Sequence, residues 1–143
     1  MTNQPLNIYA DGGARGNPGP AAIGVVIKDT NNKVLHQFGH PIGQATNNLA
    51  EYQAVIAALE YLVTNKHKPD SINFFLDSRL VVNQLNGFWK VKDTNLRQKV
   101  ITIRQLEGTL NLPIKYTAIP REKNSEPDVL LNQALDEQNH TKS

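Results

Sequence analysis

Four acidic residues of this chain have the type and the setting that metal-dependent chemistry requires: Asp11, Glu51, Asp77 and Asp128. Two of them directly follow apolar segments typical of buried strands, and two lie in the first turns of expected helices. Carboxylates that meet from such positions repel each other unless a cation lies between them. Oxygen ligands favour a hard cation such as Mg²⁺ or Mn²⁺, and two such ions roughly 3.5–4 Å apart promote in-line phosphoryl displacement.

Each acid taken alone also has a purely structural explanation. Asp11 can favour an Asp-Gly turn, and Glu51 completes the capping-box pattern Asn48-x-x-Glu51. Asp77 can cap the helix that follows it, and Asp128 belongs to a helix start with a proline in its first turn. The apolar segments before Asp11 and Asp77 favour the metal site, because carboxylates at the ends of two buried strands repel each other without a cation between them.

Length and composition indicate a single folded domain. The chain has 143 residues, of which 39% are hydrophobic and 20% charged, enough for one core and too apolar for a disordered chain. The absence of cysteine excludes disulfides and thiolate metal sites, and the four histidines have no ligand-like spacing. A net charge of +2 does not by itself predict a polyanionic partner. Without a signal pattern or an apolar run of membrane length, we expect a cytoplasmic protein with no membrane partner.

The hydrophobic pattern predicts the elements that must position these acids. Strands are expected at 6–10, 22–28, 33–39, 71–76 and 114–119, and helices at 49–63, 78–86, 95–106 and 127–137. Three strands followed by alternating helices and strands predict an α/β fold with a mixed sheet. If the first and fourth strands are neighbours, Asp11 and Asp77 share one edge of that sheet. We expect one domain at 1–138 and a polar tail at 139–143.

Four blocks of the sequence resemble the type 1 ribonuclease H family, whose members cleave the RNA strand of RNA–DNA hybrids. The blocks stand in the family order and read YADGGARGNPGP at 9–20, TNNLAEY at 46–52, LDS at 76–78 and IPREKNSEPD at 119–128. The resemblance implies a ribonuclease H-like fold, with a five-stranded mixed sheet in the order 3-2-1-4-5 and helices on both faces. It also implies two Mg²⁺ ions, with Mn²⁺ as a substitute.

The resemblance further implies a role for each site residue. Asp11 bridges both ions, Glu51 and Asp77 bind one, and Asp128 binds the other. The partner is an RNA–DNA hybrid, the products carry 5′-phosphate and 3′-hydroxyl ends, and the protein is expected to be a monomer. The positions that match substrate contacts of the family are Gly12, Gly13, Arg15, Asn17, Thr46, Asn47, Asn48, Ser78, Trp89 and Asn124.

The chain departs from common family patterns at three places. The segment 87–93 is short, so the basic protrusion of many bacterial members is missing and only Lys90 and Lys92 remain. The last loop has Arg121 where many members have a mobile histidine, and we expect Arg121 to act in its place. Arginine stays charged, so it binds phosphate or the leaving group but does not shuttle a proton. Gln44 stands where we would place an arginine of the family's DNA-phosphate pocket.

Two features allow alternative interpretations. The glycines of the first block remove side chains where a duplex backbone approaches, or they form a flexible hairpin loop. The adjacent Phe88 and Trp89 form a buried aromatic pair, or Trp89 contacts nucleic acid.

Function also has alternatives beside the hybrid-cleaving endonuclease. A catalytically weak hybrid-binding module would share the fold, and the missing basic protrusion keeps that hypothesis open. A broader nuclease that also cuts double-stranded RNA is a second alternative. A transposase-like enzyme is a third, although such enzymes usually lack the glycine-rich and Thr-Asn-Asn blocks.

Overall fold

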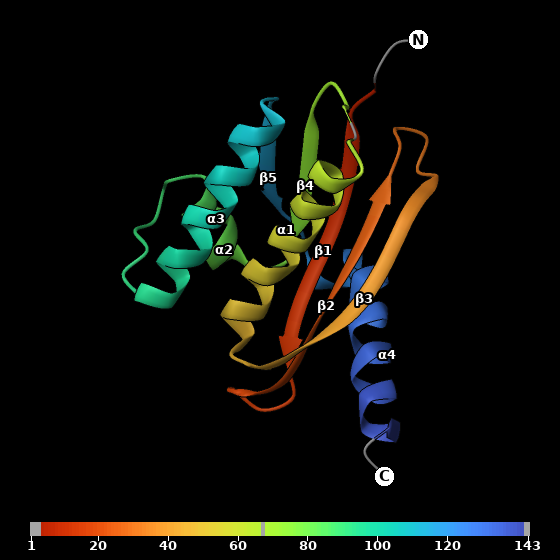
Figure 1. Ribbon diagram of the computed structural model, residues 1–143, viewed down its shortest axis with the longest axis vertical. Helices are drawn as coiled ribbons and strands as arrows, with labels where there is room; N and C mark the ends of the chain where they lie inside the picture. Colours follow the sequence, from red (N-terminus) through yellow and green to blue (C-terminus); the bar gives the residue numbers. More distant parts are fainter. Residues whose placement is uncertain (1–3, 67, 142–143) are drawn as a thin grey trace.

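A five-stranded mixed sheet forms the centre of the protein, and the computed structural model describes residues 4–66 and 68–141 (Figure 1). The strand order is β3-β2-β1-β4-β5, which confirms the predicted order. Strands β1 (Leu6–Ala14), β2 (Gly19–Lys28) and β3 (Val34–Ala45) form an antiparallel meander. Strands β4 (Ile72–Leu76) and β5 (Ile114–Ala118) run parallel to β1. The helices are α1 (Asn47–Thr64), α2 (Arg79–Leu85), α3 (Thr94–Leu110) and α4 (Ser125–Thr141), with a 3₁₀ turn η1 (Arg121–Lys123).

Two hydrophobic clusters hold the helices to the sheet. Because strand side chains alternate between faces, Ile8 and Ala10 of β1 reach the same cluster as Leu59 of α1 and Ile103 of α3. Figure 1 shows α1 and α3 on this face and α4 on the opposite one. The smaller cluster, beneath α4, consists of Ala22, Leu131, Ala134 and Leu135. The predicted placement of helices on both faces is confirmed.

The three meander strands are longer than the sequence pattern predicted. In particular, the glycine-rich block does not begin as a turn, because Asp11 pairs with Gly24 and Ala14 pairs with Ala21. Strand β2 continues opposite this segment and satisfies its backbone hydrogen bonds. The predicted strand end at Ala10 is therefore wrong, and Asp11 lies inside β1.

The helices also differ from the prediction at their ends. Helix α1 begins at Asn47, two residues early, because Thr46 caps it by accepting a hydrogen bond from the Leu49 amide at 3.2 Å. Helix α4 continues to Thr141 instead of ending at Glu137, so the expected polar tail begins inside this helix. The last two residues of that tail lie outside the described residues. Among the helices of 4–66 and 68–141, none is both long and apolar enough to cross a membrane.

Candidate active site at the end of strand β4

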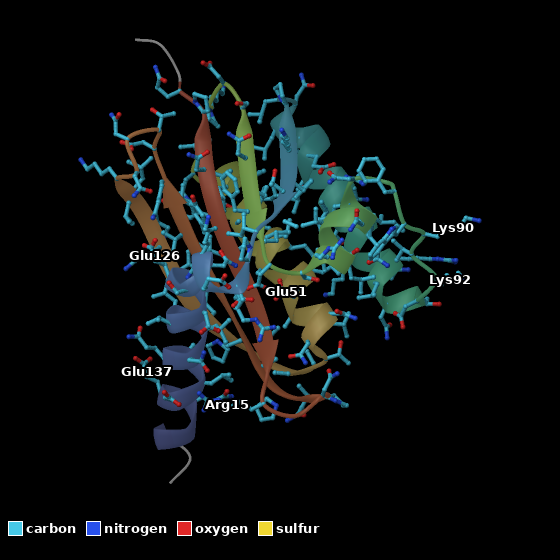
Figure 2. The ribbon with its side chains drawn as sticks, turned by 180° about the vertical axis from the view of Figure 1, so that it is seen from behind. Arg15, Glu51, Lys90, Lys92, Glu126 and Glu137 are labelled. Carbon is cyan, nitrogen blue, oxygen red and sulfur yellow. The ribbon has the colours of Figure 1, made fainter. Side chains whose placement is uncertain are left out.

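Three of the four predicted acids meet where β4 ends and its neighbour β1 continues. The pairing of the two strands reaches Tyr9 and Phe75, and Asp11 and Asp77 follow two residues later on each side. One carboxylate oxygen from each of Asp11, Asp77 and Glu51 lies within 4.8 Å of the other two. Their predicted convergence is confirmed, and in Figure 2 Glu51 lies in the middle of the molecule near the end of β4.

A glycine brings the helix that carries Glu51 against β1. A Cβ atom added at Gly12 would lie 2.1 Å from the carbonyl oxygen of Ala50 and 2.6 Å from the Glu51 amide nitrogen. Only glycine therefore lets the first turns of α1 rest on the backbone beside Asp11. At Gly12, the interpretation that a missing side chain admits a duplex is wrong, because the space is filled by α1.

The surroundings of Glu51 exclude its structural explanation. The N-cap of α1 is Thr46, so Glu51 does not stand at the capping-box position that a cap at Asn48 would require. Instead Glu51 is 7% exposed, and its Oε2 atom is buried without a hydrogen-bond partner among the described residues. A buried, unsatisfied carboxylate oxygen destabilises a fold unless another group binds it.

The charge state of the Asp11 and Glu51 pair reflects the same burial. Burial is the main cause that raises the pKa of Asp11 to about 7, and the charges of Asp77 and Asp128 act in the same direction. Burial also raises the pKa of Glu51 well above its ordinary value, and its hydrogen bond with Asp11 adds to the effect. A divalent cation would offset the repulsion and bind the unpartnered oxygen, so these residues fit such an ion.

The fourth acid comes from α4, which covers the face of the sheet opposite α1, the helix that carries Glu51. Asp128 lies in the first turn of α4 and lines the same pocket as the other three, although it lies outside their closest group. The Nδ2 amide of Asn132 donates to the Asp128 carbonyl oxygen at 2.9 Å and to its carboxylate at 3.3 Å. The Arg15 guanidinium in turn donates to Asn132 Oδ1 at 3.2 Å. The sequence prediction missed Asn132, although its spacing of four residues from Asp128 on one helix could have indicated it.

The acids open into a pocket of about 430 Å³. Predicted site residues in its lining, besides the acids, are Gly12, Gly13, Arg15, Asn47, Asn48, Ser78 and Arg121. Residues in the lining that the sequence prediction missed are Ala14, Leu131, Asn132 and Leu135. The apolar residues among these are Ala14 at the end of β1 and Leu131 and Leu135 of α4, which packs against the sheet.

The predicted substrate contact at Asn124 is not supported by its position. Asn124 is fully buried, with 0% of its surface exposed. Its Nδ2 amide donates to the Ala10 carbonyl oxygen at 2.9 Å and to the Asp77 carboxylate at 3.4 Å. A side chain without exposed surface does not meet a duplex, so Asn124 instead ties the last loop to the sheet beside Asp77.

The asparagines of the first two blocks join the glycine-rich loop to α1. The Asn47 backbone amide donates to Asn17 Oδ1 at 2.9 Å, and the Ala14 amide donates to Asn47 Oδ1 at 2.9 Å. Thr46 and Ser78 use their hydroxyl oxygens to cap α1 and α2. These side chains hold the site together, whereas Asn17, Asn47 and Asn48 are also exposed at its rim.

The aromatic pair lies at the surface. Phe88 is 76% exposed and Trp89 is 47% exposed, so the alternative of a buried pair is wrong. The backbone amides of both residues donate to the Asn83 carbonyl oxygen, which fixes the start of the segment between α2 and α3. Figure 2 shows Lys90 and Lys92 of this segment extending away from the body of the protein.

The place that the family gives to an arginine forms a separate hollow. Gln44 lines it together with Gln53 and Lys99, and the Lys99 ammonium donates to Gln53 Oε1 at 3.0 Å. A cation from α3 therefore lies in the same hollow as Gln44, although the arginine itself is absent.

A meander, two parallel strands and acids grouped at the end of β4 define a ribonuclease H-like domain. The sequence model of the reverse transcriptase-like family matches residues 9–134. The crystal structure of LC11-RNase H1 in complex with an RNA/DNA hybrid superposes with a TM-score of 0.89 and 43% identity, covering 93% of this chain and 98% of that one. The chain belongs to the type 1 ribonuclease H family.

Two curated relatives are longer than this chain. Ribonuclease HI of Halobacterium salinarum is 42% identical over 132 residues, which cover 92% of this chain and 65% of that protein. Bifunctional protein Rv2228c of Mycobacterium tuberculosis is 41% identical over 130 residues, which cover 90% of this chain and 35% of that protein. The chain thus spans less than two thirds of the length of either relative.

Proposed function

We propose that this chain is a metal-dependent endonuclease that hydrolyses the RNA strand of RNA–DNA hybrids and leaves 5′-phosphate and 3′-hydroxyl ends. The observation that carries the proposal is the buried pair of Asp11 and Glu51 beside Asp77, with one carboxylate oxygen unpartnered. Membership of the family supports it, as does the hybrid bound in the structure of a relative with 43% identity.

The four acids would hold the metal ions, and we propose Mg²⁺ with Mn²⁺ as a substitute. Asp11, Glu51 and Asp77 would hold one ion, and Asp128 together with Asp11 would hold the second. When bound, such ions activate the attacking water and stabilise the leaving oxygen. Asn132 restrains the Asp128 carboxylate through its amide, and Asn124 restrains that of Asp77. These contacts restrain the two carboxylates before an ion binds.

Residues at the rim of the pocket would recognise the RNA strand. The Oδ1 atoms of Asn17 and Asn47 each accept a hydrogen bond from a backbone amide. The Nδ2 groups of the same side chains are therefore the ones that would donate hydrogen bonds to 2′-hydroxyls. Asn48 is exposed beside them. Exposed Arg121 supplies a permanent positive charge at the pocket wall, which suits a phosphate or the leaving group.

The segment between α2 and α3 would contact the DNA strand. An exposed indole such as Trp89 offers a flat apolar surface to a sugar or a base, and Lys90 and Lys92 add positive charge beside it. The segment is short, since α2 ends at Leu85 and α3 begins at Thr94.

Cleavage of an end-labelled RNA–DNA hybrid tests the proposal. Wild type should cut the RNA strand with Mg²⁺ or Mn²⁺, and Asp11→Asn, which keeps the shape but removes a ligand charge, should not. Equal cutting by both proteins, or by neither, would refute the proposed function. A gel shift without cleavage at any metal concentration would point to a binding module. A matched double-stranded RNA in the same assay decides whether the specificity is broader.

A further inference from the structure

A second row of side chains lies directly behind the acids, on the face of the sheet that α4 covers. Tyr9 stands two residues before Asp11, and Phe75 stands two residues before Asp77. Side chains two apart on a strand point to the same face, so Tyr9 shares the face of Asp11, whereas Asp77 directly follows the end of β4. The register pairs Tyr9 with Phe75, and their rings stack with centroids 4.9 Å apart.

A nearly buried lysine extends this row to the helix of the fourth acid. The Lys28 ammonium of β2 donates to Glu126 Oε1 at 2.6 Å and lies 5.1 Å from the centroid of the Tyr9 ring. Its side chain is only 8% exposed, whereas that of Glu126 is 53% exposed. Glu126 in turn stands two residues before Asp128. The row thus connects the strands next to Asp11 and Asp77 with the first turn of α4, which carries Asp128.

The contact between α4 and the sheet explains why such a link matters. A Cβ atom at Gly24 would lie 2.0 Å from the Pro127 carbonyl oxygen, and one at Gly39 would lie 2.5 Å from that of Leu130. Backbone therefore packs on backbone, which fixes how close α4 lies to β2 and β3. Glycines present no side chain that would hinder sliding of the helix along the strands. The ion pair at Glu126 supplies a directional contact in the first turn, beside Asp128.

We propose that Lys28 is a positioning residue that sets the place of Asp128 relative to Asp11 and Asp77, acting through Glu126 and Tyr9. Desolvation makes a buried ammonium costly unless a carboxylate and an aromatic face offset it, so both contacts restrain Lys28 strongly. The catalytic consequence rests on the proposed function, whereas the consequence for metal binding does not.

The test compares Lys28→Met, Glu126→Ala and the double variant with wild type. Mn²⁺ binding is measured by calorimetry without substrate, and kcat and KM are measured on a labelled hybrid. Lys115→Met is the matched control, because Lys115 is an exposed lysine on edge strand β5. Thermal unfolding of each protein is measured first, so that all assays are run at a temperature at which every variant is folded.

Loss of the Lys28–Glu126 ion pair should weaken Mn²⁺ binding and lower kcat by about tenfold. Losses of this size are typical when a residue that supports the ligands of a metal site is removed. KM for the hybrid should stay within about twofold, because the rim that binds substrate is untouched. The double variant should lose no more Mn²⁺ affinity or kcat than the more damaged single variant, since all three remove the same ion pair. Lys28→Arg, which keeps the charge, should recover part of both losses.

Variants that lose stability but keep wild-type Mn²⁺ affinity and kcat would show a merely structural ion pair and overturn the inference. An equal loss in Lys115→Met would overturn it as well. If wild type binds Mn²⁺ but cuts no hybrid, the proposed function fails, and the Mn²⁺ affinities of the variants still decide the role of Lys28.

Discussion

At the scale of single residues, this site holds acidic groups that have little exposed surface. Asp11 is 6% exposed and Glu51 is 7% exposed, and burial raises the pKa of both carboxyl groups. The sequence predicted that these acids would meet, because they follow a strand and open a helix. It could not predict their burial, which arises from the close contact between Gly12 and α1.

This burial predicts how stability depends on pH in the metal-free protein. A carboxyl group with a raised pKa in the folded state contributes stability fully below the pKa of the unfolded chain, and the contribution is lost as pH rises through the folded-state value. For Asp11 these values are 3.8 and about 7. Urea unfolding in EDTA should therefore show wild type losing stability between pH 4 and pH 7. Asp11→Asn should be more stable than wild type at pH 8 by about 1–3 kcal/mol.

Two controls accompany this measurement. Asp70→Asn, at an exposed position, should follow wild type at both ends of the pH range. Excess Mg²⁺ should stabilise wild type at pH 8 more than Asp11→Asn, because only the intact site binds it well. A wild-type protein whose stability is constant across this pH range would contradict the expectation.

At the scale of elements, the period of apolar residues identified each helix and strand, whereas their ends depended on contacts distant in sequence. The segment from Asp11 to Ala14 contains turn-forming residues, yet it is strand because β2 lies opposite. The residue that caps α1 is Thr46 and not Asn48, which local spacing alone did not distinguish. Local patterns therefore predict the kind of element, and tertiary pairing decides where it ends.

The packing of α1 on β1 predicts unequal effects of two neighbouring substitutions. Gly12→Ala places a methyl group against the Ala50 carbonyl oxygen, so α1 must move and Glu51 with it. We expect a loss of about 1–3 kcal/mol in stability, together with weaker Mn²⁺ binding. Gly13→Ala is the matched control, because its nearest contact is Leu131 Cδ1 at 3.7 Å. Urea unfolding and calorimetry on both variants check this, and equal damage by both would be evidence against it.

The buried amide in the last loop predicts a loss of stability without a loss of substrate affinity. Asn124→Leu leaves the Ala10 carbonyl oxygen without its partner, which should cost about 1–3 kcal/mol. KM for the hybrid should remain close to that of wild type, because the residue has no exposed surface. Unfolding curves and steady-state kinetics measure the two effects. An increase in KM with unchanged stability would restore Asn124 as a substrate contact.

At the scale of the whole molecule, the strand order followed from the family resemblance, but the ion pair between β2 and α4 had no sequence signal. Lys28 and Glu126 are 98 residues apart, and Lys28 belongs to none of the four family blocks. The charged surface likewise had to be seen in three dimensions. Figure 2 shows Lys90 and Lys92 projecting on the opposite side of the molecule from Arg15, Glu126 and Glu137.

This arrangement predicts the salt dependence of hybrid binding. Each lysine that contacts a phosphate adds about one to the slope of log affinity against log salt concentration. In an Asp11→Asn background that prevents cutting, changing Lys90 and Lys92 to alanine should lower the slope by about two. Fluorescence anisotropy at several salt concentrations measures it. The same changes at Lys33 and Lys115, which are also exposed, should leave the slope unaltered, and a shared decrease would indicate diffuse attraction only.

The docking of α4 onto β2 and β3 also determines when the proposed activity can appear during synthesis. Within this domain the ribosome delivers the strands of the meander first and α4 last. A nascent chain that has reached β5 already contains Asp11, Glu51 and Asp77, but the fourth acid is still missing. The proposed cutting activity therefore requires one late step, when a helix from the end of the domain joins a surface made at its beginning.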